Sequence, residues 1–341
     1  MWHRGVFLTI GFVAVAVVHS QNPVPCSIKP RLPGQCVPEN QCPHVAIKSA
    51  QERQALKCNL GSAQGVCCQP DKVFELDFSQ CGYGGGYRAG LSIAEVTEVP
   101  WIAILLYRDA KSNKFVEDQC LGALISNQYV LTTARCLNNG KKLASVRLGE
   151  LKKSTSKDCG KIIKGSYECT ETIDVPVEST VIHEGHRSGS DLGLIRLTRK
   201  VENSKAVRPI CLPIQQNPDK PFGYNFFEVA SWYGNSDDLR KEPLAGMGTT
   251  ECQSKVRGLG ISVDSEKHLC TRITNGRCAL TESGTPVYQM ADMGPHNLRW
   301  VLYGIGSLDT SKCSARVPTD GPLLSAKVEH FVPWILENMK S

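Results

Sequence analysis

Sixteen cysteines are the residues of this chain whose type and number could do the most chemistry, either as metal ligands or as crosslinks. A metal site would want short paired spacings with histidine nearby. Only Cys67 and Cys68 lie close together, and as adjacent residues they cannot clasp one ion in the usual CxxC way. An even number of cysteines in an oxidising compartment favours disulfides. We therefore expect disulfides and no metal site.

The first residues have the composition of an export signal. Arg4 precedes an apolar run over residues 5–18, and small residues lie just before Gln21. This pattern predicts a secretory signal peptide over residues 1–20. The run is shorter than the roughly 20 residues that a membrane-spanning helix needs, and no later apolar stretch is longer. We therefore expect a secreted, extracellular protein with no membrane partner.

The net charge is too small to indicate a nucleic-acid partner. The chain carries 39 basic and 33 acidic residues, and loss of Arg4 with the signal peptide would leave a net charge of +5.

The cysteines fall into two modules joined by a tether. Residues 26–68 hold six cysteines, and so small a unit cannot bury much core, so three crosslinks are the expected substitute. Residues 69–97 form the tether, in which the run CGYGGG gives high backbone freedom. The second module covers residues 98–341.

The second module has a pattern that is nearly all β. Short apolar segments separated by polar turns predict strands over residues 101–107, 123–132 and 145–150, and regular short strands favour paired barrels. The strong helical pattern is terminal. There an apolar stripe recurs at three- and four-residue steps, consisting of Phe331, Trp334, Ile335 and Met339.

The order of motifs in this module resembles that of the chymotrypsin family of serine proteases. The motifs are EVPW (98–101), CLGALIS (120–126), LTTARC (131–136), VRLGE (146–150), DLGLIRL (191–197), VRPICLP (207–213), TESGTP (281–286) and the final WI pair. Eight motifs in one order are far more specific than any single motif. The resemblance implies an all-β, chymotrypsin-like double six-stranded β-barrel with a C-terminal helix.

The first module, which ends in VCCQ, resembles the clip domain found in front of arthropod extracellular serine proteases. Another small secreted knot is the alternative, and spacing alone leaves fifteen connectivities open. The resemblance of both modules implies eight disulfides, with Cys159 and Cys169 as the remaining pair. They are Cys26–Cys67, Cys36–Cys58, Cys42–Cys68, Cys81–Cys211, Cys120–Cys136, Cys159–Cys169, Cys252–Cys270 and Cys278–Cys313.

Carried over residue by residue, the family's catalytic acid is Asp191 and its nucleophile is Ser283, but Arg135 stands at the base position, where similar sequences read TAAHC. A serine hydroxyl becomes a nucleophile only when a neighbour accepts its proton, as neutral imidazole does. Guanidinium has five donors and no acceptor. Loss of the base alone lowers turnover on the order of a millionfold. His183 and His186 lie near Asp191, and we interpret them as surface-loop residues.

The serine loop also departs from the family pattern GDSGGP. Thr281 replaces a glycine whose N–H helps to form the oxyanion hole, Glu282 replaces an aspartate, and Thr285 replaces a second glycine. Glycine at such turns serves positive φ or close approach of a ligand, so we expect a reshaped loop. Oxyanion donors normally contribute ~10²–10³ in rate.

The activation segment and the substrate pocket depart from the family pattern as well. The activation stretch keeps a possible cleavage residue in Arg88 but would expose Ala89, which would fill the apolar insertion pocket poorly. Gly276 occupies the position of the carboxylate that binds basic substrate side chains. The segment usually written SWG begins at Ser307 and ends at Asp309, which we expect to narrow the entrance.

An unpaired charge at position 135 is physically unfavourable next to a semi-buried carboxylate. We therefore hypothesise that Arg135 forms an ion pair with Asp191, because an arginine–carboxylate fork would neutralise both groups. The alternative is that Arg135 lies on the surface.

Three functions remain from different classes. The leading one is a non-catalytic clip-domain serine protease homolog in the haemolymph. The resemblance implies that it regulates a protease cascade of the prophenoloxidase and melanisation type in innate immunity, with clip-domain proteases, other homologs or prophenoloxidase as partners. The others are a weakly active trypsin-like endopeptidase and a module that recognises microbial surfaces. No cofactor is expected.

Overall fold

The computed structural model describes most of the chain after the predicted signal peptide. The described residues are 24–29, 32–72, 76, 79–84, 93–109, 112, 114–161, 166–214, 226–232, 236–273, 282–293, 297–309 and 322–340. The signal peptide over residues 1–20 lies outside them. Among the helices of these segments, none has the length and apolar character needed to cross a membrane.

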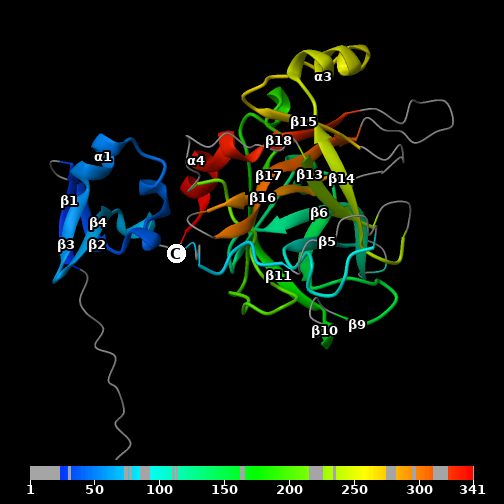
Figure 1. Ribbon diagram of the computed structural model, residues 1–341, viewed down its shortest axis with the longest axis horizontal. Coiled ribbons are helices and arrows are strands. Elements are labelled where there is room, and N and C mark those ends of the chain that lie inside the picture. Colours follow the sequence, from blue (N-terminus) through cyan, green and yellow to red (C-terminus); the bar gives the residue numbers. More distant parts are fainter. Residues whose placement is uncertain are drawn as a thin grey trace, which may run out of the picture.

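Two closed antiparallel barrels of six strands each make up most of the molecule (Figure 1). The strands of the first barrel are β5 (Ile102–Arg108), β6 (Phe115–Leu124), β7 (Tyr129–Thr132), β8 (Lys142–Leu148), β11 (Ile173–Ile182) and β12 (Gly193–Leu197). Those of the second are β13 (Phe226–Ser231), β14 (Arg240–Gly246), β15 (His268–Ile273), β16 (Pro286–Asp292), β17 (Leu298–Asp309) and β18 (Leu323–Lys327). The expected all-β double-barrel fold is therefore confirmed.

Strand β5 shows how an apolar run of the sequence forms a buried strand of the barrel. Residues 102–107 are all buried, so both faces of this strand are covered by neighbours. The prediction of one strand over residues 123–132 is wrong, because β6 ends at Leu124 and β7 begins at Tyr129. Between them, the Ser126 hydroxyl accepts hydrogen bonds from the N–H groups of Gln128 and Tyr129, which stabilises a turn.

The C-terminal helix α4 (Val328–Asn338) confirms the predicted apolar stripe. Phe331, Ile335 and Met339 are buried and Trp334 is half-buried. These side chains join the large core cluster that also contains the interior of the first barrel. The terminal stripe therefore anchors the helix on the barrels.

The first module is a small four-stranded sheet with its own core. Its elements are β1 (Val24–Lys29), β2 (Leu32–Val37), η1 (Glu39–Gln41), η2 (Pro43–Val45), α1 (Ala50–Ala55), β3 (Lys57–Leu60) and β4 (Ala63–Cys68), with the sheet order β1-β2-β4-β3. Four aliphatic side chains, Val37, Val45, Leu56 and Val66, pack around the cystines. Crosslinks therefore supply much of the interior of a module too small for a large core.

Seven disulfides lie within the described residues. They are Cys26–Cys67, Cys36–Cys58, Cys42–Cys68, Cys81–Cys211, Cys120–Cys136, Cys159–Cys169 and Cys252–Cys270. Each of these pairs is one that the resemblance implies. The eighth expected pair, Cys278–Cys313, falls outside the described residues.

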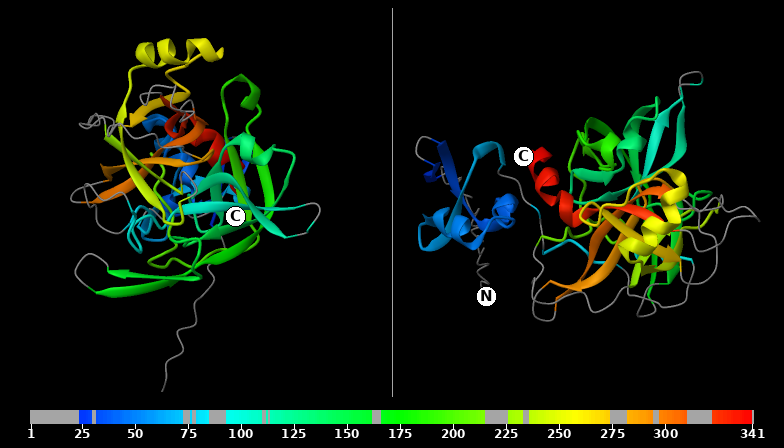
Figure 2. Two further views of the ribbon diagram at one scale, coloured as in Figure 1. Left: turned by 90° about the vertical axis from the view of Figure 1, so that its right-hand side faces the viewer. Right: turned by 90° about the horizontal axis from the view of Figure 1, so that it is seen from above.

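The small module lies beside the C-terminal helix, as Figure 1 and the right-hand view of Figure 2 show. After η3 (Pro70–Lys72), the Lys72 ammonium donates a hydrogen bond to the backbone carbonyl of Glu337 at the end of α4. Further along the tether, the disulfide Cys81–Cys211 joins it covalently to the larger module. Gly82 adds backbone hydrogen bonds to Pro209 and Trp300.

A buried ionic cluster lies at the seam between the barrels. Glu98 precedes the first barrel, and its carboxylate contacts the Lys241 ammonium on β14, with side chains 6% and 2% exposed. Glu228 on β13 accepts a hydrogen bond of 3.0 Å from the Tyr288 hydroxyl. Burial raises the pKa of Glu228 to about 7, against the opposing effect of Lys241. Burial also raises the pKa of Tyr288 well above its usual value, so its hydroxyl stays protonated.

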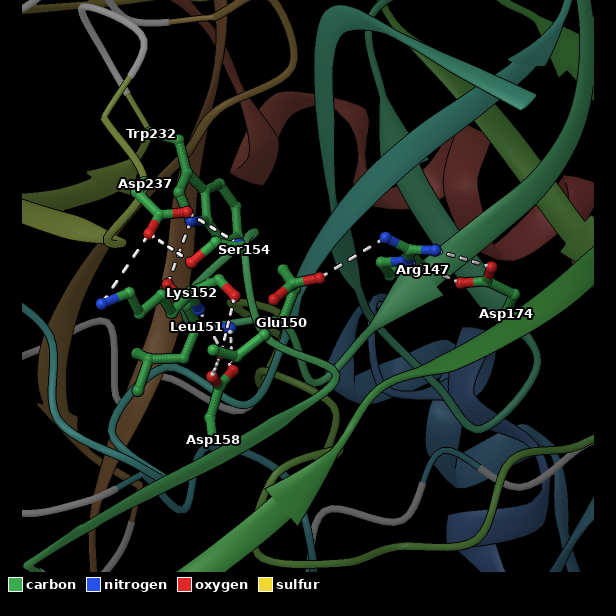
Figure 3. A network of polar contacts seen from close by, with 10 residues as sticks. Arg147, Glu150, Leu151, Lys152, Ser154, Asp158, Asp174, Trp232 and Asp237 are labelled. Carbon is green, nitrogen blue, oxygen red and sulfur yellow. Dashed lines mark hydrogen bonds and ion pairs between the residues drawn. The ribbon is translucent and has the colours of Figure 1, made fainter. Parts of the chain in front are cut away.

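The hairpin of β9 (Lys157–Lys161) and β10 (Tyr167–Glu171) is attached to the first barrel by a second polar network (Figure 3). Asp158 is 5% exposed, and its carboxylate accepts from the N–H groups of Leu151 at 3.0 Å and Lys152 at 3.1 Å. The Thr155 hydroxyl donates a third bond to this carboxylate, at 2.5 Å. One carboxylate therefore holds three donors of the same loop.

Each neighbouring charge in this network also has a partner. Arg147 forms a two-pronged contact with Asp174 at 2.8 and 3.0 Å and lies 3.5 Å from Glu150. Asp237 accepts from Ser154, and these bonds lower the pKa of its carboxyl. Figure 3 shows Asp174 facing Arg147, and Asp237 facing Ser154 and Lys152.

Candidate functional site

The fold brings the degenerate triad positions together where the two barrels meet. Arg135 lies on the short helix α2 (Ala134–Leu137), whose N-cap is Thr133. Asp191 lies just before β12, and Ser283 lies just before β16. The disulfide Cys120–Cys136 fixes α2, and the N–H of Leu121 donates to the carbonyl of Ser283 at 2.8 Å. The first barrel therefore positions the serine loop of the second barrel directly.

Asp191 is held firmly by two donors. The backbone N–H of Arg135 donates to Oδ1 at 3.0 Å, and the Ser307 hydroxyl on β17 donates to Oδ2 at 2.7 Å. Each carboxylate oxygen therefore accepts a hydrogen bond from a neutral donor. The acid of the expected triad is present, half-buried and oriented.

The hypothesis that the Arg135 side chain pairs with Asp191 is wrong. Arg135 is exposed, and within the described residues its guanidinium forms no hydrogen bond or ion pair. The Asp191 carboxylate is instead stabilised by hydrogen bonds from the backbone N–H of Arg135 and the Ser307 hydroxyl, so it does not depend on the guanidinium. The guanidinium keeps its hydration at the surface, which avoids the desolvation penalty of a buried ion pair.

The Ser283 hydroxyl has a partner that the sequence did not suggest. It lies 2.8 Å from the Thr133 hydroxyl, and the same Thr133 oxygen accepts the N–H of Cys136 at 3.3 Å. Thr133 is fully buried. The available signal was LTTARC against TAAHC, because Thr133 replaces an alanine there. A threonine hydroxyl is not a base near neutral pH, so this contact positions Ser283 without activating it.

The described part of the serine loop forms a tight turn. Thr285 is fully buried, and both its N–H and its hydroxyl donate to the carbonyl of Glu282, at 3.1 and 2.5 Å. Gly284 has a φ of +86°, and a Cβ at this position would lie 1.9 Å from the carbonyl oxygen of Leu121. The retained glycine is therefore required, because any side chain would collide with backbone there.

His183 is a structural residue of the loop before Asp191. Its ring packs edge-on to Phe331 at 5.2 Å and against Trp334 at 5.0 Å, and its Nδ1 accepts the N–H of Gly185 at 3.0 Å. Burial lowers the pKa of His183, which disfavours the charged form of its imidazole. The sequence interpretation of His183 as a surface-loop residue is therefore right about the loop but not about the surface, because its side chain is 14% exposed.

An open cleft of about 620 Å³ lies beside Asp191. Its lining comes from α2, from the loop around η4 (His186–Ser188), from the segment 260–262 and from β15, β17 and β18. The lining residues are Ala134, Arg135, Asn138, His186, Arg187, Ser188, Gly189, Asp191, Gly260, Ile261, Ser262, His268, Ser307 and Leu324. Arg135, Asp191 and Ser307 thus meet in one cleft, and His186, which the sequence placed near Asp191, lines it as well.

Several predicted positions lie outside the described residues. They are the possible cleavage residue Arg88, the oxyanion position Thr281 and the pocket position Gly276. Asp309 ends β17, where its backbone pairs with Leu323 of β18. The predicted effects of these residues stay predictions.

One cluster has metal-ligand residue types but unsuitable chemistry. Cys42, His44 and Cys68 place their ligand atoms within 4.8 Å of one another. The two sulfurs are joined in a disulfide, so neither is the thiolate that binds zinc. This cluster therefore supports no metal site.

Comparisons with known proteins agree with this architecture. A family model described as Trypsin matches residues 90–335. Serine protease ea of Drosophila melanogaster is 30% identical over 72% of this chain, a match that spans 66% of that protein's own length. CLIP domain-containing serine protease HP8 of Bombyx mori is 30% identical over 72% of this chain and 68% of that protein.

Two similar proteins extend the match over the small module. Phenoloxidase-activating factor 3 of Holotrichia diomphalia is 28% identical over 100% of both chains. The crystal structure of the Drosophila Grass clip serine protease of the Toll pathway has the same fold, with a TM-score of 0.65, 24% identity and coverage of 94% of this chain and 98% of that one. The chain therefore belongs to the trypsin family of serine proteases, in its arthropod clip-domain branch.

Proposed function

We propose that this protein is a secreted, non-catalytic clip-domain serine protease homolog that regulates an extracellular protease cascade of the prophenoloxidase and melanisation type in innate immunity. The observation that carries the proposal is the environment of Ser283. Its hydroxyl contacts Thr133, while the base position holds the exposed Arg135. The acid and the nucleophile are in place, but the group that must accept the proton is missing.

A triad that keeps its acid and its nucleophile but lacks its base is not partly active. The acid acts by orienting the base and stabilising its protonated form, so Asp191 has nothing to assist once imidazole is replaced by guanidinium. Losing the base alone is about as damaging as losing the whole triad, on the order of a millionfold in turnover. The substitutions Thr281 and Glu282 in the serine loop add to this loss.

The regulatory role and its partners are inferred from the relatives. Phenoloxidase-activating factor 3, which matches this chain over its full length, is named for phenoloxidase activation. By extension, the expected partners are clip-domain proteases, other homologs or prophenoloxidase in haemolymph. The seven disulfides of the described residues favour an oxidising, extracellular compartment.

The catalytic part of the proposal is tested with the purified mature chain, before and after cleavage at Arg88. We expect no turnover of peptide or ester substrates above buffer and no labelling of Ser283 by a serine-reactive phosphonate, with a working clip-domain protease as positive control. Steady ester hydrolysis that disappears in Ser283→Ala would contradict the proposal.

The variant Arg135→His tests whether the base is the sole defect. We expect no recovery of peptidase activity, because Thr133 holds the Ser283 hydroxyl and the serine loop is altered as well. Measurable recovery would show that only the base had been lost.

The regulatory part is tested by adding the mature chain to a clip-domain protease and prophenoloxidase. We expect the rate of phenoloxidase formation to change with the concentration of the added chain, although the chain itself cleaves nothing. A rate that stays the same at every concentration would count against the role.

A further inference from the structure

The cleft beside Asp191 is cationic in a way that the proposed function does not explain. Arg135 on α2 and Arg187 in η4 both line it and both are exposed. Within the described residues, neither guanidinium has a hydrogen-bond or ion-pair partner. Asp191 is the acidic residue among the lining residues, and its two oxygens accept hydrogen bonds from the Arg135 N–H and the Ser307 hydroxyl. The two arginines therefore outnumber the one carboxylate of the lining, and neither forms an ion pair with it.

The walls of the cleft are tied together. His268 on β15 of the second barrel contacts the carbonyl oxygen of Gly189 in the first barrel through Nε2, at 2.9 Å. Its Nδ1 accepts the N–H of Asp264 at 2.9 Å, so the proton lies on Nε2 and is donated to Gly189. The His268 ring thus bridges the two barrels beside the cleft. This hydrogen bond links the two walls of the cleft.

The size and lining of the cleft suit a short peptide segment. Its volume of about 620 Å³ lies inside the usual range of ligand pockets, roughly 300–1,000 Å³. Guanidinium groups bind carboxylates through two parallel hydrogen bonds, and arginine clusters are a recurring means of recognising acidic motifs. Ile261 and Leu324 add apolar surface that can cover the methylene groups of glutamate side chains.

We infer that this cleft is a binding site for an acidic peptide segment of a partner protein, with Arg135 and Arg187 as the two residues that receive its carboxylates. The inference rests on the proposed function, in which a bound segment is retained and not cleaved. In this inference Arg135 has two effects: it replaces the general base, and it supplies a cation to the cleft.

A sulfated polysaccharide is the competing class of ligand, and the lining favours a peptide over it. A polyanion binds through a row of cations along its length, whereas this cleft presents two arginines together with aliphatic and small polar side chains. The experiment therefore includes a heparin fragment as a separate probe.

Fluorescence anisotropy of the full mature chain tests the inference. The probes are a labelled hexapeptide of alternating aspartate and glutamate, its asparagine and glutamine counterpart, and a labelled heparin hexasaccharide. We expect the acidic peptide to bind at least tenfold more tightly than its amide counterpart and to weaken as salt rises. Arg135→Gln and Arg187→Gln should each weaken the acidic peptide about tenfold.

The matched control is Arg199→Gln, which removes the same charge from an exposed residue that does not line the cleft. It should change the affinity less than twofold. Equal loss in all three variants, no preference for the acidic peptide, or binding of heparin alone would each overturn the inference. Turnover is measured separately, so failure of the proposed function would appear as cleavage and failure of this inference as absence of binding.

Discussion

At the seam between the barrels, the Lys241 ammonium contacts Glu98 and lies near Glu228, and the side chains of the contacting pair are almost completely buried. In the cleft, Arg135 and Arg187 are exposed, and neither has a partner among the described residues. A buried cation without a partner would cost several kcal/mol, whereas an exposed one keeps its hydration. The buried charges at the seam therefore contribute to the stability of the fold, whereas the exposed charges of the cleft are available to a ligand.

Lys241→Met tests whether the buried ion pair at the seam is structural. The variant leaves Glu98 buried without its cation, so we expect the free energy of unfolding to fall by about 3–5 kcal/mol. Urea unfolding followed by tryptophan fluorescence measures the change, and Lys200→Met, at an exposed position, is the control. A loss below about 1 kcal/mol would mean that the seam pair is not structural.

Glu228 makes the stability of the seam depend on pH. Its pKa is about 7 in the folded protein, and the unfolded chain loses the same proton near the usual value of 4.5. The folded state therefore holds the extra proton between these values, and stability falls as pH rises from about 5 to 7. We expect a loss on the order of 1–3 kcal/mol across this window.

Unfolding profiles of the wild type and Glu228→Gln measure this dependence. The variant should lack that part of the slope, whereas Glu171→Gln at an exposed position should keep it. Parallel profiles for the wild type and Glu228→Gln would contradict the assignment.

Asp158→Asn tests whether the loop network needs a negative charge, because the Asp158 carboxylate accepts hydrogen bonds from three donors (Figure 3). The amide can accept at one oxygen only and brings two donors of its own, so we expect a loss of about 1–2 kcal/mol. Hydrogen exchange of the Leu151 and Lys152 amides should speed up with it. Unchanged protection of these amides would show that the loop does not need the charge.

The cleft arginines should give the smallest effect on stability. Arg135→Gln and Arg187→Gln remove exposed, unpaired charges, so we expect changes within about 0.5 kcal/mol. Thermal unfolding midpoints check this. A large destabilisation by either variant would place these residues among the structural charges and erase the difference between the two regions.

Ordered motifs and periodicity predicted the larger architecture because they record burial. The terminal stripe of Phe331, Ile335 and Met339 is buried as expected, and strand β5 follows its apolar run. The segment 123–132 was predicted as one strand, because the apolar residues on both sides hide the Ser126 turn between them. Periodicity records which residues are buried, but a short side-chain-stabilised turn leaves little trace in it.

The site was harder to predict, because its decisive contacts depend on side-chain direction. The motifs assigned roles to positions 135, 191 and 283, and the structure brings Asp191 to the backbone of Arg135 and Ser283 to the hydroxyl of Thr133. The contact between Thr133 and Ser283 and the exposure of Arg135 could not be predicted from the motifs, since both depend on side-chain rotamers in the folded protein. The backbone N–H of Arg135 reaches Asp191 without any choice of rotamer.

The disulfide Cys81–Cys211 spans 130 residues and has a consequence for proteolysis of the tether. A cut anywhere between these two cysteines would yield two polypeptides that separate only under reducing conditions. The small module would remain in the immediate vicinity of the barrels, because residues 69–80 would still connect it to Cys81 and set its effective concentration. Scission there would thus leave this connection intact and preserve the stoichiometry of the two parts.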